Sequence, residues 1–244
     1  MCIRDRANAD NDSAGFTVTQ SSGSTAVAES GSTDTFTVVL TAEPGSDVVI
    51  SVTSGDTGEA TVSAASLTFT SSNWDSAQTI TVTGVDDDII DGSVNATITL
   101  AVVDGSSDDD FDSLANQTVT AANADNDSAG FTVTQSSGST AVAESGSTDT
   151  FTVVLTAEPG SDVVISVTSG DTGEATVSAS SLTFTSSNWD SAQTITVTGV
   201  DDDIIDGSIN TTITLAVVDG SSDDNFDSLA NQTVTAANAD NDEP

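Results

Sequence analysis

The sequence predicts an all-β protein made of two tandem β-sandwich domains, each with seven to eight strands. The first supporting observation is an internal repeat of 115 residues, which is present twice with only four differences. The second is an alternation of apolar residues with Thr and Ser along most of the unit, which is typical of half-buried strands. The third is that no segment has a 3.6-residue apolar period, so long amphipathic helices are not expected.

The repeat defines the predicted domains. Residues 7–121 match residues 122–236, and a unit of this size can bury a core without disulfides or metal clusters. The four differences are Ala65/Ser180, Val94/Ile209, Ala96/Thr211 and Asp110/Asn225. We expect a leader and the end of a preceding repeat at 1–12, repeat 1 at 13–127, repeat 2 at 128–242 and the start of the next repeat at 243–244. Residues 1–6 do not fit the repeat and are expected to be non-native.

Strands are predicted where apolar residues alternate between Gly, Asp, Asn and Ser turns. In chain order, the residues expected to face the core are Phe16 and Val18; Phe36, Val38 and Leu40; Val48, Ile50 and Val52; Leu67 and Phe69; Ile80 and Val82; Ile98, Leu100 and Val102; and Val119. Trp74 lies between two of these segments and is expected to cap one end of the core, as is its copy Trp189.

The charge of the chain is extremely one-sided. Residues 7–244 contain no Lys, Arg or His, but they hold 38 of the 39 acidic residues. This composition excludes nucleic acid and anionic membrane surfaces as partners, because both are bound through Lys and Arg. No apolar segment approaches the ~18 residues of a membrane span, so direct membrane insertion is not expected. The counter-charge has to come from cations in solution or from bound metal.

The acidic residues cluster where strands are predicted to end. Asp86-Asp87-Asp88 is followed by Asp91, and Asp125 and Asp127 mark the boundary of the repeats. A solvated acidic loop is the usual explanation for one such run. However, two like charges 4 Å apart repel by about 4 kcal/mol at an effective dielectric of 20, and no cationic side chain relieves that repulsion. An all-oxygen set without His or Cys favours Ca²⁺ over Mg²⁺, zinc, copper or iron.

These acidic segments resemble the Calx-beta family and the Calx-beta-like repeats of large bacterial surface adhesins. The resemblance lies in Glu29, Asp56, residues 86–92 and 124–127, and in the run from Leu67 to Val82, and it covers the whole unit twice. It implies an immunoglobulin-like sandwich that binds Ca²⁺ at one end. The metal ligands implied are Glu29, Asp56, Asp86, Asp87, Asp91, Asp125 and Asp127 in repeat 1, and Glu144, Asp171, Asp201, Asp202, Asp206, Asp240 and Asp242 in repeat 2.

The chain departs from the family pattern at two places in each repeat. Asp91 and Asp206 stand where the family commonly has Glu, and Asn126 and Asn241 replace the middle member of a terminal Asp triplet. Both departures imply fewer ions or weaker binding.

These features favour a Ca²⁺-rigidified spacer of a secreted or bacterial cell-surface protein, an adhesin, in which neighbouring repeats of the same chain are partners. Any cell-surface or glycan target would be reached through other domains of the parent protein. The alternative is a glycan- or surface-binding module, although each repeat has one Trp and no Tyr. Catalysis is not expected, because neither repeat contains His, Lys, Tyr or Cys. Near-perfect duplication and the absence of Lys favour a bacterial array over an intracellular calcium sensor.

Overall fold

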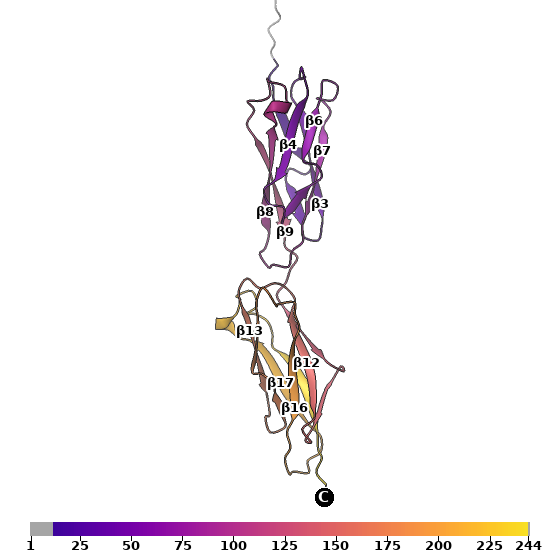
Figure 1. Cartoon of the computed structure of the whole chain (residues 1–244), viewed down its shortest axis with the longest axis vertical. Coiled ribbons are helices and arrows are strands. Elements are labelled where there is room, and N and C mark those ends of the chain that lie inside the picture. The colour runs from indigo at the N-terminus through magenta and orange to yellow at the C-terminus, as the bar shows by residue number, and fades with distance from the viewer. Residues whose placement is uncertain (1–11, 244) are drawn as a thin grey trace, which may run out of the picture. The chain divides into compact units, whose positions relative to one another are not determined.

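The computed structural model describes residues 12–243, and within them the chain forms two compact units whose division falls after Asn126 (Figure 1). The strands run along the length of each unit. Apart from Asp12, the leader expected at the N-terminus lies outside the described residues, as does Pro244. The domain limits 13–127 and 128–242 stay a prediction from the repeat.

The first unit contains nine strands in its described residues, together with one short 3-10 helix, η1 (Asp104–Ser106). The strands are β1 (Phe16–Gln20), β2 (Thr25–Ala28), β3 (Thr33–Leu40), β4 (Val48–Ser54), β5 (Ala60–Val62), β6 (Ser66–Phe69), β7 (Gln78–Gly84), β8 (Val94–Val102) and β9 (Gln117–Ala124).

Two sheets form the sandwich of this unit. One sheet has the strand order β1-β3-β7-β5 and is antiparallel throughout, and the other has the order β2-β9-β8-β4-β6. In the second sheet β2 runs parallel to β9, with Ala28 opposite Ala124. The chain changes sheets between β1 and β2 at a turn where Gly23 has a φ of 82°, a conformation that L side chains rarely adopt. This change of sheet delivers the end of β2 to the end of β9.

The second unit repeats this architecture. Its sheets have the orders β10-β12-β16-β14 and β11-β18-β17-β13-β15, and its 3-10 helix is η2 (Asp219–Ser221). The strands are β10 (Phe131–Gln135), β11 (Thr140–Ala143), β12 (Thr148–Leu155), β13 (Val163–Ser169), β14 (Ala175–Val177), β15 (Ser181–Phe184), β16 (Gln193–Gly199), β17 (Ile209–Val217) and β18 (Gln232–Ala239).

The core of each unit lies between its two sheets. The apolar residues predicted to face inward are buried in the first unit, except that Val18 and Val102 are half-buried. Burying each Val, Leu, Ile or Phe side chain contributes about 1.5–3 kcal/mol, so this set holds the sandwich without disulfides. Trp74 packs against the core, and its carbonyl oxygen accepts a hydrogen bond from the Leu40 N–H at 3.1 Å. The predicted fold class is therefore confirmed.

Two strands were not among the predicted segments. They are β2, with the sequence Thr-Ala-Val-Ala, and β5, with the sequence Ala-Thr-Val. Both are short and carry small side chains, so their alternation is too weak to detect from the sequence. They still matter, because each leads directly to or from an acidic residue.

No helix within residues 12–243 has the length and apolar character required to span a membrane.

Candidate metal centre

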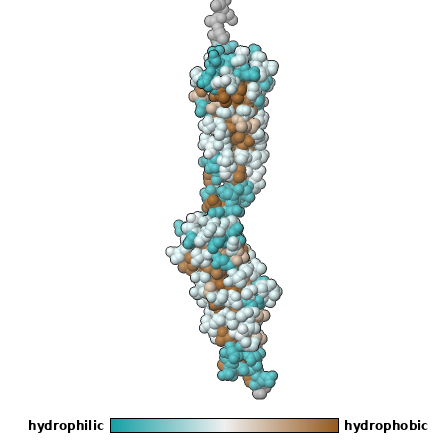
Figure 2. Space-filling model, viewed as in Figure 1, coloured by the Kyte–Doolittle hydropathy of each residue, from teal (hydrophilic) through white to brown (hydrophobic). Residues whose placement is uncertain are grey.

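One end of each sandwich gathers the ends of strands from both sheets. In the first unit β2 and β9 finish side by side at Ala28 and Ala124, while Gly84 at the end of β7 pairs with Ala60 at the start of β5. The Gly84 N–H also donates to the Ser32 carbonyl at 3.0 Å, which places the end of β7 next to the chain leaving β2. Acidic residues that follow or precede these strands must therefore meet. On the face shown in Figure 2, hydrophilic side chains accumulate at the corresponding end of the second unit, where the chain leaves it.

The first group of carboxylates consists of Glu29, Asp125 and Asp127, which we call the Glu29 group. Each residue offers one carboxylate oxygen, and these oxygens lie within 4.8 Å of one another. Glu29 directly follows β2 and is only 1% exposed, and its N–H donates to the Ala124 carbonyl at 3.1 Å. The parallel pairing of β2 with β9 is thus what brings Glu29 to Asp125. The copy in the second repeat is Glu144, Asp240 and Asp242.

The second group consists of Glu59, Asp87 and Asp91, which we call the Glu59 group. Its carboxylate oxygens also lie within 4.8 Å of one another, and its copy is Glu174, Asp202 and Asp206. Glu59 directly precedes β5, whereas Asp87 and Asp91 come from the segment between β7 and β8. The backbone hydrogen bond from Val85 N–H to the Glu59 carbonyl, at 2.9 Å, fixes these two segments against each other.

A buried amide orients Glu59. Asn123 on β9 is fully buried, and its Nδ2 donates to Glu59 Oε2 at 3.1 Å and to the Val85 carbonyl at 2.9 Å. Space for this amide depends on Gly84, because a Cβ there would lie 2.2 Å from the Ala28 carbonyl oxygen and 2.6 Å from Asn123 Oδ1. Asn238, Glu174 and their neighbours repeat the arrangement. The glycine and the asparagine together hold a carboxylate in the Glu59 group.

Backbone and amide donors connect the two groups. The Gly92 N–H donates to Asp125 Oδ2 at 2.8 Å, and Gly92 has a φ of 74°, which favours glycine. The Asn126 N–H donates to Glu29 Oε2 at 2.9 Å, while Asn126 Nδ2 donates to Asp86 Oδ1 at 2.8 Å. The two groups therefore form one acidic assembly at this end of the sandwich.

Crowding of carboxylates changes their acidity. Burial raises the pKa of Asp91, and the charges of Asp87 and Asp125 add to the increase. Burial and the charge of Asp240 also raise the pKa of Asp242, whose buried Oδ2 accepts no hydrogen bond. These carboxylates thus favour an added positive charge, whether a proton or a metal ion.

Two opposing effects act on the pKa of Glu144. The Asn241 N–H lowers its pKa by donating to the carboxylate, at 3.0 Å from Oε2. Burial and the charges of Asp240, Asp202 and Asp242 outweigh this donor, so the pKa of Glu144 is raised overall.

The spacing of each group suits calcium. Ca²⁺ binds six to eight oxygens at about 2.3–2.6 Å, so two oxygens on one ion lie at most about 5 Å apart. Three carboxylate oxygens within 4.8 Å meet that condition, and carbonyl oxygens or water can supply the remaining ligands. A bound Ca²⁺ would be held by the Glu29 group or the Glu59 group, where it would neutralise the carboxylates and join the strand ends that carry them.

Most of the ligands expected from the sequence lie in these groups. Glu29, Asp87, Asp91, Asp125 and Asp127 are grouped in the first repeat, and their copies are grouped in the second. Asp86 lies outside the groups and accepts a hydrogen bond from the side-chain amide of Asn126. Asp201 accepts the equivalent hydrogen bond from Asn241.

Asp56 and its copy Asp171 also lie outside both groups. Asp56 Oδ1 accepts a hydrogen bond from the Gly58 N–H at 3.0 Å, so this side chain closes its own turn. Glu59, three residues later, enters the acidic assembly instead, although sequence reasoning missed it. Its position just before a short strand was the available signal, and β5 was itself too short to be recognised.

A second acidic cluster lies at the opposite end of the first unit, around η1. Burial raises the pKa of Asp112, as do a hydrogen bond with the Asp104 side chain and the nearby charges of Asp104, Asp109 and Asp108. Asp108 Oδ2 accepts a hydrogen bond from the Ser46 N–H at 2.9 Å, and backbone donors lower its pKa. None of the grouped carboxylate sets within the described residues includes these acids.

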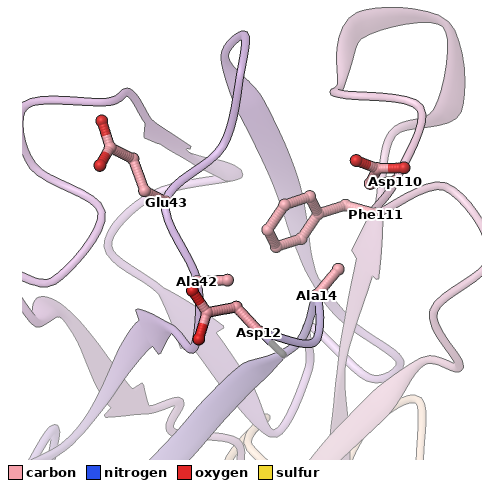
Figure 3. Close-up of a pocket in the computed structure, with 6 residues that line it drawn as sticks. All are labelled: Asp12, Ala14, Ala42, Glu43, Asp110 and Phe111. Carbon is pink, nitrogen blue, oxygen red and sulfur yellow. The ribbon is translucent and has the colours of Figure 1, made fainter. Parts of the chain in front are cut away.

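A pocket of about 370 Å³ lies beside this second cluster (Figure 3). The phenyl ring of Phe111 faces into it near Ala14, and carboxylates stand around its margin. The side chains that line it contain one aromatic ring and no hydrogen-bond donor when the acids are ionised. The lining residues are Asp12, Ala14, Ala42, Glu43, Asp110 and Phe111.

Comparisons with known proteins give similarity in structure alone. No family model matches the chain, and no curated protein matches it. A crystal structure of the calcium binding domain CBD12 of CALX1.1 is 17% identical, covers 83% of this chain and 81% of its own, and has a TM-score of 0.35. Domains 4 and 5 of the S-layer protein SbsC are 18% identical, cover 93% of this chain and 99% of their own, and have a TM-score of 0.37. The apo-form Calx CBD1 domain is 15% identical, covers 46% of this chain and 98% of its own, and has a TM-score of 0.33.

Proposed function

We propose that this chain is a calcium-binding structural spacer, formed by extender repeats of a secreted or cell-surface bacterial adhesin. One observation carries the proposal. Each repeat brings six carboxylates together in two groups at one end of a sandwich, and residues 7–244 contain no Lys, Arg or His to neutralise them. A bound cation would relieve the repulsion within such an assembly, and its all-oxygen donors suit Ca²⁺.

The role of the ion is structural. The Glu29 group joins the ends of β2 and β9 in one sheet, and the Glu59 group joins the segment before β5 to the segment after β7 in the other. Ca²⁺ bound there would hold the end of the sandwich closed, and Asp125 and Asp127 at the repeat boundary would restrict the motion of the chain between repeats. Calcium that binds the folded state and not the unfolded state raises stability by mass action, so stability should rise with calcium concentration at constant ionic strength.

An extracellular setting is compatible with a calcium site of low affinity. Extracellular calcium modules commonly have Kd values of roughly 10⁻⁴ to 10⁻³ M, so a site of that affinity would bind calcium outside the cell but not at the much lower concentration inside it. The absence of basic residues also suits a surface protein that has to stay soluble without binding nucleic acid.

The glycan-binding alternative has less support. The pocket beside Phe111 offers a sugar one aromatic face and several carboxylates, with no cationic side chain to orient a bound glycan. Enzymatic activity also has little support, because neither repeat contains a His, Lys, Tyr or Cys to act as acid, base or nucleophile.

The test compares the full chain in EDTA, CaCl₂ and MgCl₂. Equilibrium dialysis should detect at least one Ca²⁺ per repeat, and the melting temperature should rise with CaCl₂ far more than with MgCl₂ at the same ionic strength. Small-angle X-ray scattering should give a different maximum dimension in CaCl₂ than in EDTA, because bound calcium would restrict the motion of the chain between repeats. No bound calcium, with equal melting temperatures in the three solutions, would reject the proposal.

A further inference from the structure

We infer that the side-chain amide of Asn126, with its copy Asn241, occupies the position of a cation between two carboxylates and so reduces the number of metal ions each repeat requires. The inference concerns the same acidic assembly and rests on the proposed calcium function. On this inference, the residue at position 126 or 241 determines how strongly the stability of its repeat depends on bound metal.

The hydrogen bonds of Asn126 carry the inference. Its Nδ2 donates to Asp86 Oδ1 at 2.8 Å and lies 3.4 Å from Glu29 Oε2, and its N–H donates to Glu29 Oε2 at 2.9 Å. In the second repeat Asn241 Nδ2 lies 2.8 Å from Asp201 Oδ1 and 3.4 Å from Glu144 Oε2. The same residue thus contacts two carboxylates in each repeat.

These contacts connect both sheets of the sandwich. Glu29 follows β2 and Asn126 follows β9, which belong to one sheet, whereas Asp86 follows β7 of the other sheet. A divalent cation at the same place would make a similar connection by binding carboxylate oxygens from both segments. The amide does so with two N–H donors and no net charge.

Replacing this asparagine with aspartate would exchange a hydrogen-bond donor for a negatively charged acceptor of nearly the same shape. An ionised carboxylate only accepts hydrogen bonds, so it cannot donate to Glu29 or Asp86. Without metal, a third carboxylate would repel the other two, and the end of the sandwich would lose a donor and gain a charge. With calcium, the same carboxylate would become an additional oxygen ligand. The substitution should therefore act in opposite directions in the two conditions.

Removing the amide without adding a charge separates these effects. Asn126→Ala with Asn241→Ala should weaken the metal-free repeat and should not increase calcium binding. Asn126 and Asn241 are exposed at the surface, so both pairs of substitutions are compatible with a folded core.

The experiment uses the full chain and three proteins: the parent, the Asn126→Asp/Asn241→Asp variant and the Asn126→Ala/Asn241→Ala variant. Melting temperature is measured in EDTA and in 10 mM CaCl₂, and bound calcium is counted by equilibrium dialysis. In EDTA, the alanine variant should melt about 5 °C below the parent and the aspartate variant lower still. In CaCl₂, the aspartate variant should bind one more ion per repeat or bind calcium about tenfold more tightly than the parent, and the alanine variant should not.

Two results would overturn the inference: equal melting temperatures of the three proteins in EDTA, or an aspartate variant that binds no more calcium than the alanine variant. Failure of the proposed function gives a different pattern, because the parent itself would then bind no calcium. In that case, a lower melting temperature of both variants in EDTA would still support the amide connection, and unchanged melting temperatures would reject it.

Discussion

Replacing Glu59 and Glu174 with glutamine tests which acidic residue of the segment before β5 binds metal. Sequence resemblance points to Asp56, whereas the structure places Glu59 with Asp87 and Asp91 and turns Asp56 toward the Gly58 N–H. Glutamine keeps the size of the side chain. Its carbonyl oxygen can still accept the hydrogen bond that Asn123 Nδ2 donates to Glu59 Oε2 at 3.1 Å. It removes one of the three carboxylates of the Glu59 group.

The expected loss can be estimated from linkage. With a Kd of roughly 10⁻⁴ to 10⁻³ M, 10 mM CaCl₂ stabilises the folded state by about 1.4–2.7 kcal/mol for each ion. Two groups per repeat therefore supply about 3–5 kcal/mol, and Glu59→Gln with Glu174→Gln should remove about half. For a domain of this size, that corresponds to about 5–10 °C in melting temperature.

The assay is thermal unfolding of the full chain at several calcium concentrations, with EDTA as the reference. In EDTA the glutamine variant should melt no lower than the parent, because it loses a charge from a crowded group. The matched control is Asp56→Asn with Asp171→Asn, since asparagine can also accept the hydrogen bond from the following turn. Full calcium stabilisation of the glutamine variant, or loss of that stabilisation in the Asp56 control, would refute the assignment of Glu59.

Three further changes test the fold around the site. Phe69→Ala with Phe184→Ala empties a fully buried position in each core and should lower the free energy of unfolding by about 3–5 kcal/mol per unit in urea titrations; a loss under about 1 kcal/mol would contradict the packing described. Gly84→Ala with Gly199→Ala forces a Cβ to within 2.2 Å of a carbonyl oxygen and should destabilise each unit by about 1–3 kcal/mol or more, whereas Gly105→Ala, where nothing lies within 4 Å, should change stability by less than about 0.5 kcal/mol in the same titration. Donation from Ser21 Oγ, and then from the Ala26 and Thr35 N–H groups, lowers the pKa of Asp34 below 3.8, so its contribution to stability is present above pH 3.8 and is lost as the pH falls through the lower folded-state pKa. Asp34→Asn with Asp149→Asn should therefore flatten the decline of melting temperature below pH 3.8 in EDTA, and an unchanged decline would count against these hydrogen bonds.

Local patterns predicted the sandwich well because strand periodicity is a property of neighbouring residues. Phe36, Val38 and Leu40 alternate with polar residues on β3, and all three are buried. β2 and β5 escaped detection because small residues such as Ala26 and Ala60 give little periodic contrast. Their positions depend on pairing with strands distant in the sequence, which no local pattern records.

The sequence by itself determined that the protein is all-β, that one unit of 115 residues is duplicated, and that its carboxylates have no cationic side chain to neutralise them. These are properties of composition and spacing, so they need no knowledge of which strands pair. Only the tertiary structure decided which acids meet. The parallel pairing of β2 with β9 brings Glu29 to Asp125, and the pairing of β5 with β7 brings Glu59 near Asp87. Strand register between distant segments sets these contacts, and it also turns Asn126, where the family resemblance implied only a missing ligand, into a donor to two carboxylates.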